Sequence, residues 1–279
     1  MSSNPLAKFF RQPAIYARLP SGGKNWPVGT INMPPNSELP ILPMTAIDEI
    51  TYRTPDALFN GEAVTGVIQS CVPSIKNAWA TPSIDVDTIL VAIRIASYGH
   101  EMEIGTKCPK CGEEHEFGLD LRTVIDNFKP ADYAATLKKG DLEFYFRPLN
   151  YREMTENSLM QFEQQKTLQQ VNETDGLEES EKMTRLNAMM KKLVEVTVRA
   201  MSQSIMEIRT PDALVSDRVH IDQFLANCER GIFNSVRDHV IELREKSELK
   251  PLDLTCPSCT NQYQQTFTLD MASFFAAAS

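Results

Sequence analysis

Two short cysteine pairs carry the strongest chemical signal in the chain. Cys108 and Cys111 are separated by two residues, and so are Cys256 and Cys259. A Cys-x-x-Cys knuckle places two thiolates on one side of a tetrahedral metal ion, and two knuckles complete a four-thiolate site. The sequence therefore predicts a zinc ion held by these four cysteines. A closed four-thiolate site has no open position for a substrate, so the predicted role of the zinc is structural.

The residues around each pair indicate how the chain presents the sulfur atoms. Strand-like segments flank the first pair at 103–106 and 115–119 and the second pair at 252–255 and 263–269. Each pair is therefore expected at the tip of a β-hairpin, which is how a zinc ribbon is built. Residues 112–255 lie between the two halves. The predicted ribbon is split and joins two distant parts of the chain.

Other interpretations of the cysteine pairs are open. A redox Cys-x-x-Cys usually opens a helix, whereas the prolines and glycine near these pairs favour tight turns. Disulfides need an oxidising compartment, and no apolar leader follows the N-terminal Met-Ser-Ser-Asn. Two separate sites, or no metal at all, are the remaining alternatives.

The other candidate ligands are expected to be structural. His115 competes as a ligand, but its place on the outgoing strand favours a solvent-facing side chain. Cys71 and Cys228 stand alone among apolar residues and are expected to be buried thiols. Asp85 and Asp87 are expected at a helix cap or on the surface. The four histidines are dispersed and none lies beside a plausible nucleophile, so no catalytic residues are predicted and the chain is expected not to be an enzyme.

Composition restricts the class of partner. The 279 residues are 42% hydrophobic and carry a net charge of −9, which fits one large or two modest globular domains. The lysines are scattered and form no basic run, so nucleic-acid binding is not expected. No apolar stretch approaches the length of a membrane span. We expect a cytosolic chain whose partners are proteins.

The chain contains an internal repeat. The sequence Arg-Thr-Pro-Asp-Ala-Leu occurs at residues 53–58 and again at 209–214. Thr is a good helix N-cap, Pro suits the first helical position and Asp complements the helix dipole, so both copies predict a helix start. Upstream of each copy, a strand and a Pro precede a capping residue, Thr45 in one and Asn150 in the other.

These likenesses predict an α+β fold that is mainly α-helical, with two related helical halves bridged by the split ribbon. The halves are expected at 38–121 and 141–271, each ending in a zinc knuckle. The alternative is that capping signals recur in any helical protein. A preceding region, residues 1–37, mixes aromatics with Pro and Gly. It predicts an extended arm, with a strand at 15–19 and a turn at 21–23, that covers either the chain's own core or a neighbouring subunit.

The second half carries an insertion at about 157–205 that predicts an antiparallel helical hairpin. Its second helix shows an apolar stripe at spacings of three and four, formed by Met183, Leu186, Met190, Leu193, Thr197 and Ala200. Helical spacing usually means core packing, so burial of the methionines is the favoured interpretation. A docking arm for another protein is the alternative, because methionine suits adaptable surfaces.

Several segments resemble a known family. Residues 16–23, Met44-Thr45, residues 53–61 and residues 108–112 are similar to the baseplate hub proteins of T-even-type contractile-tailed phages. The resemblance implies a non-enzymatic role in the central hub of the tail baseplate, with other hub and baseplate proteins as partners. It implies action in the host cytoplasm during assembly and leaves open whether the protein stays in the virion tail baseplate. A zinc-ribbon accessory factor of transcription or replication and a transient assembly chaperone are the other function classes.

Overall fold

The structure is a computed structural model, which describes residues 4–52, 60–129, 131–173 and 179–266. Two compact units make up the chain: unit 1 consists of Met1–Pro130 and Ser247–Ser279, and unit 2 of Ala131–Lys246. Unit 1 is therefore discontinuous in sequence. Both units combine helices and strands, which confirms the predicted mixed fold class.

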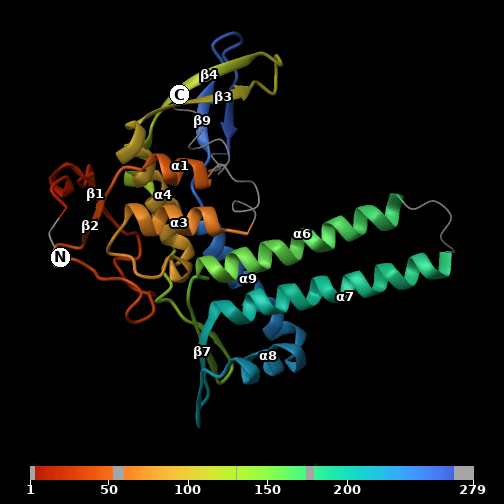
Figure 1. The fold of residues 1–279 in the computed structure, drawn as a ribbon. Coiled ribbons are helices and arrows are strands. Elements are labelled where there is room, and N and C mark those ends of the chain that lie inside the picture. The colour runs from red at the N-terminus through yellow and green to blue at the C-terminus, as the bar shows by residue number, and fades with distance from the viewer. Residues whose placement is uncertain (1–3, 53–59, 130, 174–178, 267–279) are drawn as a thin grey trace. The chain divides into compact units, whose positions relative to one another are not determined.

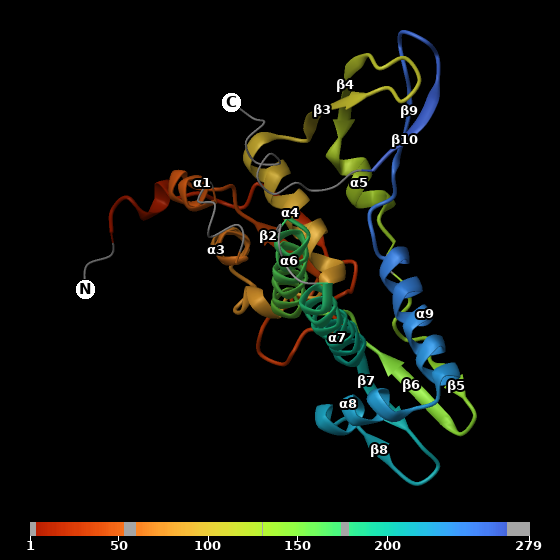
Figure 2. The ribbon, with the colours of Figure 1, turned by 90° about the vertical axis from the view of Figure 1, so that its right-hand side faces the viewer.

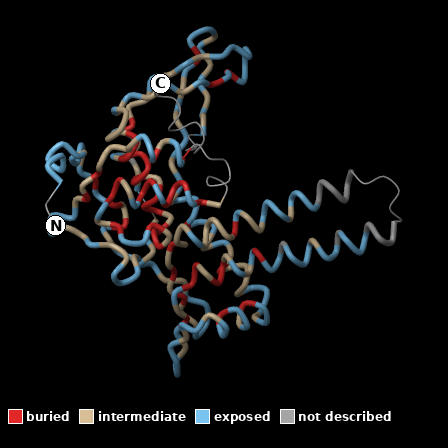
Figure 3. Tube along the Cα trace, in the orientation of Figure 1, coloured by how far each residue is buried: buried red, intermediate tan, exposed pale blue. Residues whose placement is uncertain are grey.

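Helices form the core of unit 1 (Figures 1 and 3). The described helices are α1 (Ala46–Tyr52), α3 (Glu62–Cys71), α4 (Ser83–Tyr98), α5 (Leu121–Asn127) and the 3-10 turns η1 (Ala7–Phe9) and η2 (Ala78–Ala80). Buried residues run almost without interruption from Ile84 to Arg94, so α4 is covered on nearly every side. A helix that is apolar all round belongs in the centre of a domain. It ends at Gly99, whose φ of +88° suits glycine.

The N-terminal region is part of this core. Strand β1 (Ile15–Arg18) pairs antiparallel with β2 (Glu38–Ile41), with Ala17 opposite Leu39. Ala17 and Leu39 are both buried. The predicted strand at 15–19 and turn at 21–23 are confirmed. Of the two placements left open for the arm, the contacts support the one on the chain's own core.

Two further hairpins belong to unit 1. Strand β3 (Glu101–Lys107) pairs with β4 (Glu114–Asp120), and β9 (Leu252–Thr255) pairs with β10 (Gln262–Gln265). Each pair forms its own two-stranded antiparallel sheet. The predicted hairpins around the cysteine pairs are therefore confirmed, although residues 267–269 of the last expected strand lie outside the described residues.

Unit 2 is built on a four-stranded antiparallel sheet of order β5-β6-β7-β8 (Figure 2). Its strands are β5 (Leu137–Lys139), β6 (Leu142–Phe146), β7 (Ile205–Arg209) and β8 (Leu214–Val215). The helices are α6 (Tyr151–Glu173), α7 (Glu179–Ser204), α8 (Arg218–Asn227) and α9 (Arg230–Lys246). Apolar side chains of the sheet and of α7, α8 and α9 share one core, which includes Phe144, Phe146, Met201, Ile205, Ile221, Leu225 and Val236.

The helix start expected at 209–214 is wrong. Arg209 ends β7 and pairs with Leu214 of β8, and the residues between them form a turn. The Thr210 hydroxyl accepts hydrogen bonds from the backbone N–H groups of Asp212 and Ala213. A Thr side chain can satisfy turn amides as well as helix amides, so the same six residues suit a hairpin. The first copy, residues 53–58, lies outside the described residues.

The strand–Pro–cap pattern is confirmed in both places. Thr45 and Asp48 bond reciprocally to each other's backbone N–H at the start of α1, and Asn150 and Glu153 do the same at the start of α6. The common origin of two halves at 38–121 and 141–271 stays a prediction. The compact units are divided differently, because both cysteine pairs belong to unit 1.

Helices α6 and α7 lie side by side and extend beyond the sheet of unit 2 (Figure 1). Burial of the methionine stripe is wrong for Met183 and Met190, whose exposed fractions are 57% and 61%. Val196 and Met201, nearer the end of α7 that joins the sheet, are buried. That end of α7 packs with the sheet, α8 and α9, and Met201 lies in their shared core. The side chains of Leu186 and Leu193 lie outside the described residues.

Candidate metal centre

The four cysteines of the two hairpin tips converge in unit 1. Their sulfur atoms all lie within 4.8 Å of one another. The Sγ atoms of Cys108 and Cys259 are 3.7 Å apart, and those of Cys111 and Cys256 are 3.6 Å apart. Four sulfurs placed tetrahedrally around zinc at a Zn–S distance of about 2.3 Å are separated by about 3.8 Å. The group therefore has the dimensions of a site that could hold a metal ion.

The two tips have the same backbone conformation. Cys108 N–H donates to Glu113 O and Gly112 N–H donates to Cys108 O, both at 2.9 Å. The second tip repeats this pattern with Cys256, Asn261 and Thr260, again at 2.9 Å. The fifth residue of each turn has a positive φ, +75° at Gly112 and +56° at Thr260. Two equivalent turns thus present their sulfurs in the same way.

The thiols differ in exposure and in proton affinity. Cys108 and Cys256 are buried, Cys259 is half-buried and Cys111 is exposed. A hydrogen bond from the backbone N–H of Cys111 is the main reason that the pKa of Cys108 is lowered to about 6. Thiolates packed this closely repel one another, so all four are ionised together only when a cation shares their charge. The donor set is suited to a soft divalent ion such as zinc.

His115 was expected to face solvent, but it lies against the cysteines. Its Nε2 atom is 3.4 Å from Cys256 Sγ and 3.3 Å from Ser258 Oγ. The reason is that the tip of the β9–β10 hairpin, which carries Cys256 and Ser258, lies against the His115 side chain. Thr106 and Tyr263 form a second side-chain hydrogen bond between the hairpins. His115 is outside the set of mutually close ligand atoms, so its place is that of a group that orients a ligand.

Most of the chain matches a model of one known protein family. The chain matches the family model described as T4 bacteriophage base plate protein over residues 18–276. The chain belongs to this baseplate family. The resemblance to T-even-type baseplate proteins is thereby confirmed at the level of the baseplate. No curated protein and no solved structure matches the chain. Among the described helices of this baseplate protein, none is long and apolar enough to cross a membrane.

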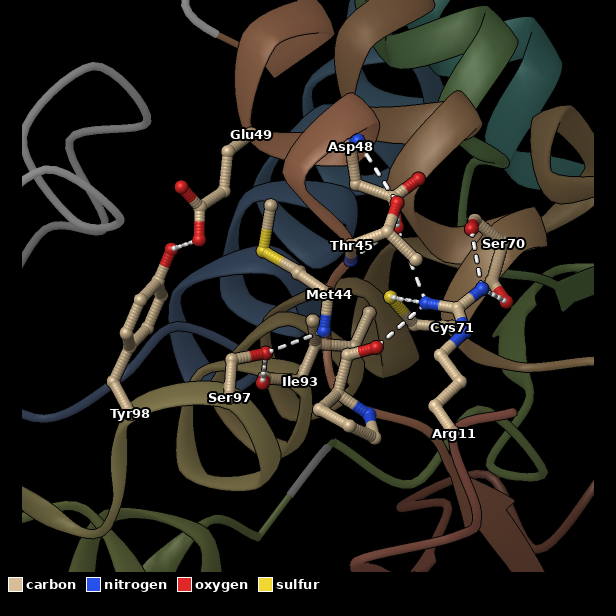
Figure 4. Close-up of polar contacts among 11 residues, drawn as sticks. Arg11, Met44, Thr45, Asp48, Glu49, Ser70, Cys71, Ile93, Ser97 and Tyr98 are labelled. Carbon is tan, nitrogen blue, oxygen red and sulfur yellow. Dashed lines mark hydrogen bonds and ion pairs between the residues drawn. The ribbon is translucent and has the colours of Figure 1, made fainter. Parts of the chain in front are cut away.

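The baseplate protein holds its N-terminal region through a half-buried arginine that sequence reasoning missed (Figure 4). Arg11 Nη1 donates to Pro43 O at 2.6 Å and to Asp48 Oδ2 at 3.1 Å, and its Nη2 donates to the backbone and hydroxyl oxygens of Ser70 at 2.7 Å. Burial raises the pKa of Asp48, but hydrogen bonds from Thr45 and Ser70 and the charge of Arg11 outweigh it, so the pKa lies below its usual value.

In unit 2, too, an arginine binds the carboxylate of a helix-capping pair. Arg147 binds both carboxylate oxygens of Glu153, at 2.9 and 2.6 Å, and Glu153 is the acid of the capping pair with Asn150. The sequence signal for both is an acid three residues after a capping residue. No sequence pattern identifies the two arginines. Arg11 lies far before its capping residue Thr45, whereas Arg147 lies shortly before Asn150.

Two aspartates also depart from expectation. Asp85 is fully buried and accepts hydrogen bonds from Ser21 N–H, the Ser21 hydroxyl and Trp26 Nε1, at 2.9, 2.6 and 2.7 Å. The expected cap or surface role is therefore wrong for Asp85, which ties the N-terminal region to α4. Burial and the neighbouring Glu248 raise the pKa of Asp87 to about 6.

The lone cysteines are placed as structural groups. Cys71 is fully buried, as expected, and burial raises its pKa to about 12. Cys228 is only half-buried at the end of α8, where its Sγ lies 3.7 Å from Leu225 O. Over the described part of the chain, the four tip cysteines are the only group of three or more His, Cys, Asp or Glu side chains with metal-site geometry.

Proposed function

We propose that the chain is a non-enzymatic structural or assembly component of the central hub of the phage tail baseplate, and that it acts through protein–protein contacts. The match to the baseplate family over residues 18–276 carries the proposal. The net charge of −9 and the scattered lysines support protein partners. The proposed partners are other baseplate and hub proteins, met in the host cytoplasm during assembly and in the tail baseplate.

The proposal includes one structural zinc ion held by Cys108, Cys111, Cys256 and Cys259. The sulfur spacing and the equivalent turns support it. Elemental analysis of the purified protein tests it, with a Cys256→Ser and Cys259→Ser double variant alongside. We expect one zinc per chain in the wild type and in a Cys228→Ser control, and none in the double variant. Wild-type protein without zinc would overturn this part of the proposal.

The hub role is tested in phage that cannot make the protein. We expect such phage to produce heads and incomplete baseplates that lack the central hub, and we expect supply of the wild-type protein to restore infectious particles. Complete baseplates with hubs in its absence would refute the role. Mass spectrometry of purified particles then separates a resident subunit, present in the tail, from a transient assembly chaperone, which is absent from it.

The nucleic-acid alternative has its own measurement. A zinc-ribbon accessory factor would bind DNA or RNA with an affinity that falls steeply as salt is raised. We expect no binding at low salt, because the acidic chain offers no basic run. Salt-dependent binding would favour the accessory-factor class instead.

A further inference from the structure

The ribbon lacks an apolar core of its own. Across the described residues of its two hairpins, 101–120 and 252–265, the only buried side chains are those of Thr106, Cys108 and Cys256. The apolar residues Ile104, Phe117, Leu254 and Tyr263 are only half-covered. A small structure without a core requires a disulfide, a metal or a partner to hold it together. The sulfur cluster occupies the place that apolar side chains fill elsewhere.

The two hairpins are joined by side chains alone. They form separate two-stranded sheets, and no strand of one pairs with a strand of the other. Apart from those of the cysteines, the side-chain hydrogen bonds described between them are Thr106–Tyr263 and His115–Ser258. A few exposed or half-exposed hydrogen bonds contribute only about 0.5–1.5 kcal/mol each. Two such hydrogen bonds hold the hairpin only weakly.

The hairpins are anchored unequally to the rest of unit 1. The β3–β4 hairpin runs directly from α4 and into α5, and Leu121, which is fully buried, donates its backbone N–H to His100 O at 2.8 Å. Its base is thus closed by the helical core. Strands β9 and β10 contribute no residue to the buried apolar core. A two-stranded hairpin by itself is marginally stable in water.

We infer that metal binding latches the β9–β10 hairpin onto unit 1. With metal the ribbon is closed; without metal β9–β10 separates from β3–β4 while the helical core around α4 stays folded. The inference rests on the proposed zinc site. It adds that the metal fixes the position of the C-terminal hairpin only and is not required for folding of the helical core. Metal binding is coupled to ordering because the thiolates are assembled only in the closed form.

Hydrogen–deuterium exchange of the full-length protein tests the latch, with bound zinc measured in every sample. We expect peptides over 252–265 to be protected in the zinc-loaded protein and to exchange at least tenfold faster after zinc is removed with a chelator. Peptides over α4, Ser83–Tyr98, should keep their protection, and added zinc should restore the first group. The Cys228→Ser protein should behave as wild type.

Three outcomes would contradict the latch. If zinc is removed and residues 252–265 keep their protection, the latch is wrong while the zinc site stands. If α4 loses protection together with the hairpin, the metal supports the whole unit and not one hairpin. If purified protein holds no zinc, the proposed site and the latch fall together. A Tyr263→Phe variant gives a second measurement: release of the hairpin in its zinc-loaded form would show that side-chain contacts, not metal, hold it.

Discussion

Thr260 occupies a position at which the other knuckle has glycine. Its φ of +56° is unfavourable for a β-branched residue, whereas Gly112 adopts +75° without strain. A Cβ at Gly112 would meet only Lys107 Cε at 3.9 Å, so backbone conformation and not space decides the preference there. Backbone strain can therefore be removed at residue 260 by a glycine and introduced at residue 112 by a threonine.

Replacing Thr260 with glycine should strengthen the second knuckle. We expect Thr260→Gly to stabilise the closed ribbon by about 1 kcal/mol, because the strain of a non-glycine residue at positive φ is removed. The measurement is zinc affinity by competition with a chromogenic chelator. Gly112→Thr is the control and should weaken zinc binding by a similar amount. Equal affinities in all three proteins would contradict the expectation.

Arg11 and Arg18 lie close in sequence and differ in burial. The Arg11 side chain is 24% exposed beside a nearly buried Asp48, whereas Arg18 is 75% exposed beside Glu38. Removing one member of a buried pair leaves an uncompensated charge, and removing a surface pair costs little. We expect Arg11→Met to lower the free energy of unfolding by about 3 kcal/mol and Arg18→Met to change it by less than about 1 kcal/mol. Urea titration measures both, and equal losses would contradict the assigned role of Arg11.

Asp87 gives a pH dependence. Its pKa is raised from 3.8 to about 6 in the folded protein, so the folded state binds the proton more tightly than the unfolded state does. Stability associated with this group is therefore greatest below about pH 4 and falls as pH rises through about 6. Asp87→Asn should accordingly be more stable than wild type at pH 7 by about 1–3 kcal/mol, with the difference vanishing near pH 4. A difference that does not change with pH would refute the assignment.

At the scale of elements, the N-terminal region is tied to three helices by a few side chains. Arg11 reaches α1 and α3, and Ser21 and Trp26 reach Asp85 of α4. Residues before Arg11 include Leu6, Phe9 and Phe10, all exposed. The region therefore divides into a short exposed end and a longer part that completes the core.

Matched truncations test this division. Deleting residues 1–10 should leave the melting temperature of the protein nearly unchanged, because all the described residues of this stretch, 4–10, are exposed. Deleting residues 1–26 removes β1, Arg11 and the partners of Asp85, and should abolish the cooperative unfolding transition. Circular dichroism with heating measures both. A folded protein after the longer deletion would show that the region is a detachable arm.

Local signals in the sequence were sufficient for some elements. The spacing of each cysteine pair and the alternation around it predict a hairpin because both depend on neighbouring residues. The contact of His115 with Cys256 and Ser258 joins residues far apart in the chain, and no local pattern contains it. The turn at Thr210 was mistaken for a helix start because its residues satisfy backbone amides in either setting. The methionine stripe identifies the apolar face of α7. Which element covers that face depends on the tertiary structure, and the sequence pattern does not contain it.

At the scale of the whole molecule, the zinc proposal connects residues far apart in the chain. The Cys108 and Cys256 knuckles meet although most of the sequence lies between them. Sequence alone predicted this closure because four thiolates satisfy one ion. It did not predict that both knuckles belong to one compact unit and that residues 131–246 form another. The boundary between compact units depends on which distant residues contact one another, and local sequence patterns do not show this.

The discontinuity of unit 1 has a consequence for synthesis on the ribosome. The chain emerges N-terminus first, so Ala131–Lys246 leaves the ribosome before Cys256 and Cys259 do. The first knuckle must wait with two unshared thiols during that interval. A chain terminated between residues 246 and 256 would therefore contain all of unit 2 and lack Cys256 and Cys259. Completion of the ribbon would mark a chain that has been translated through residue 259.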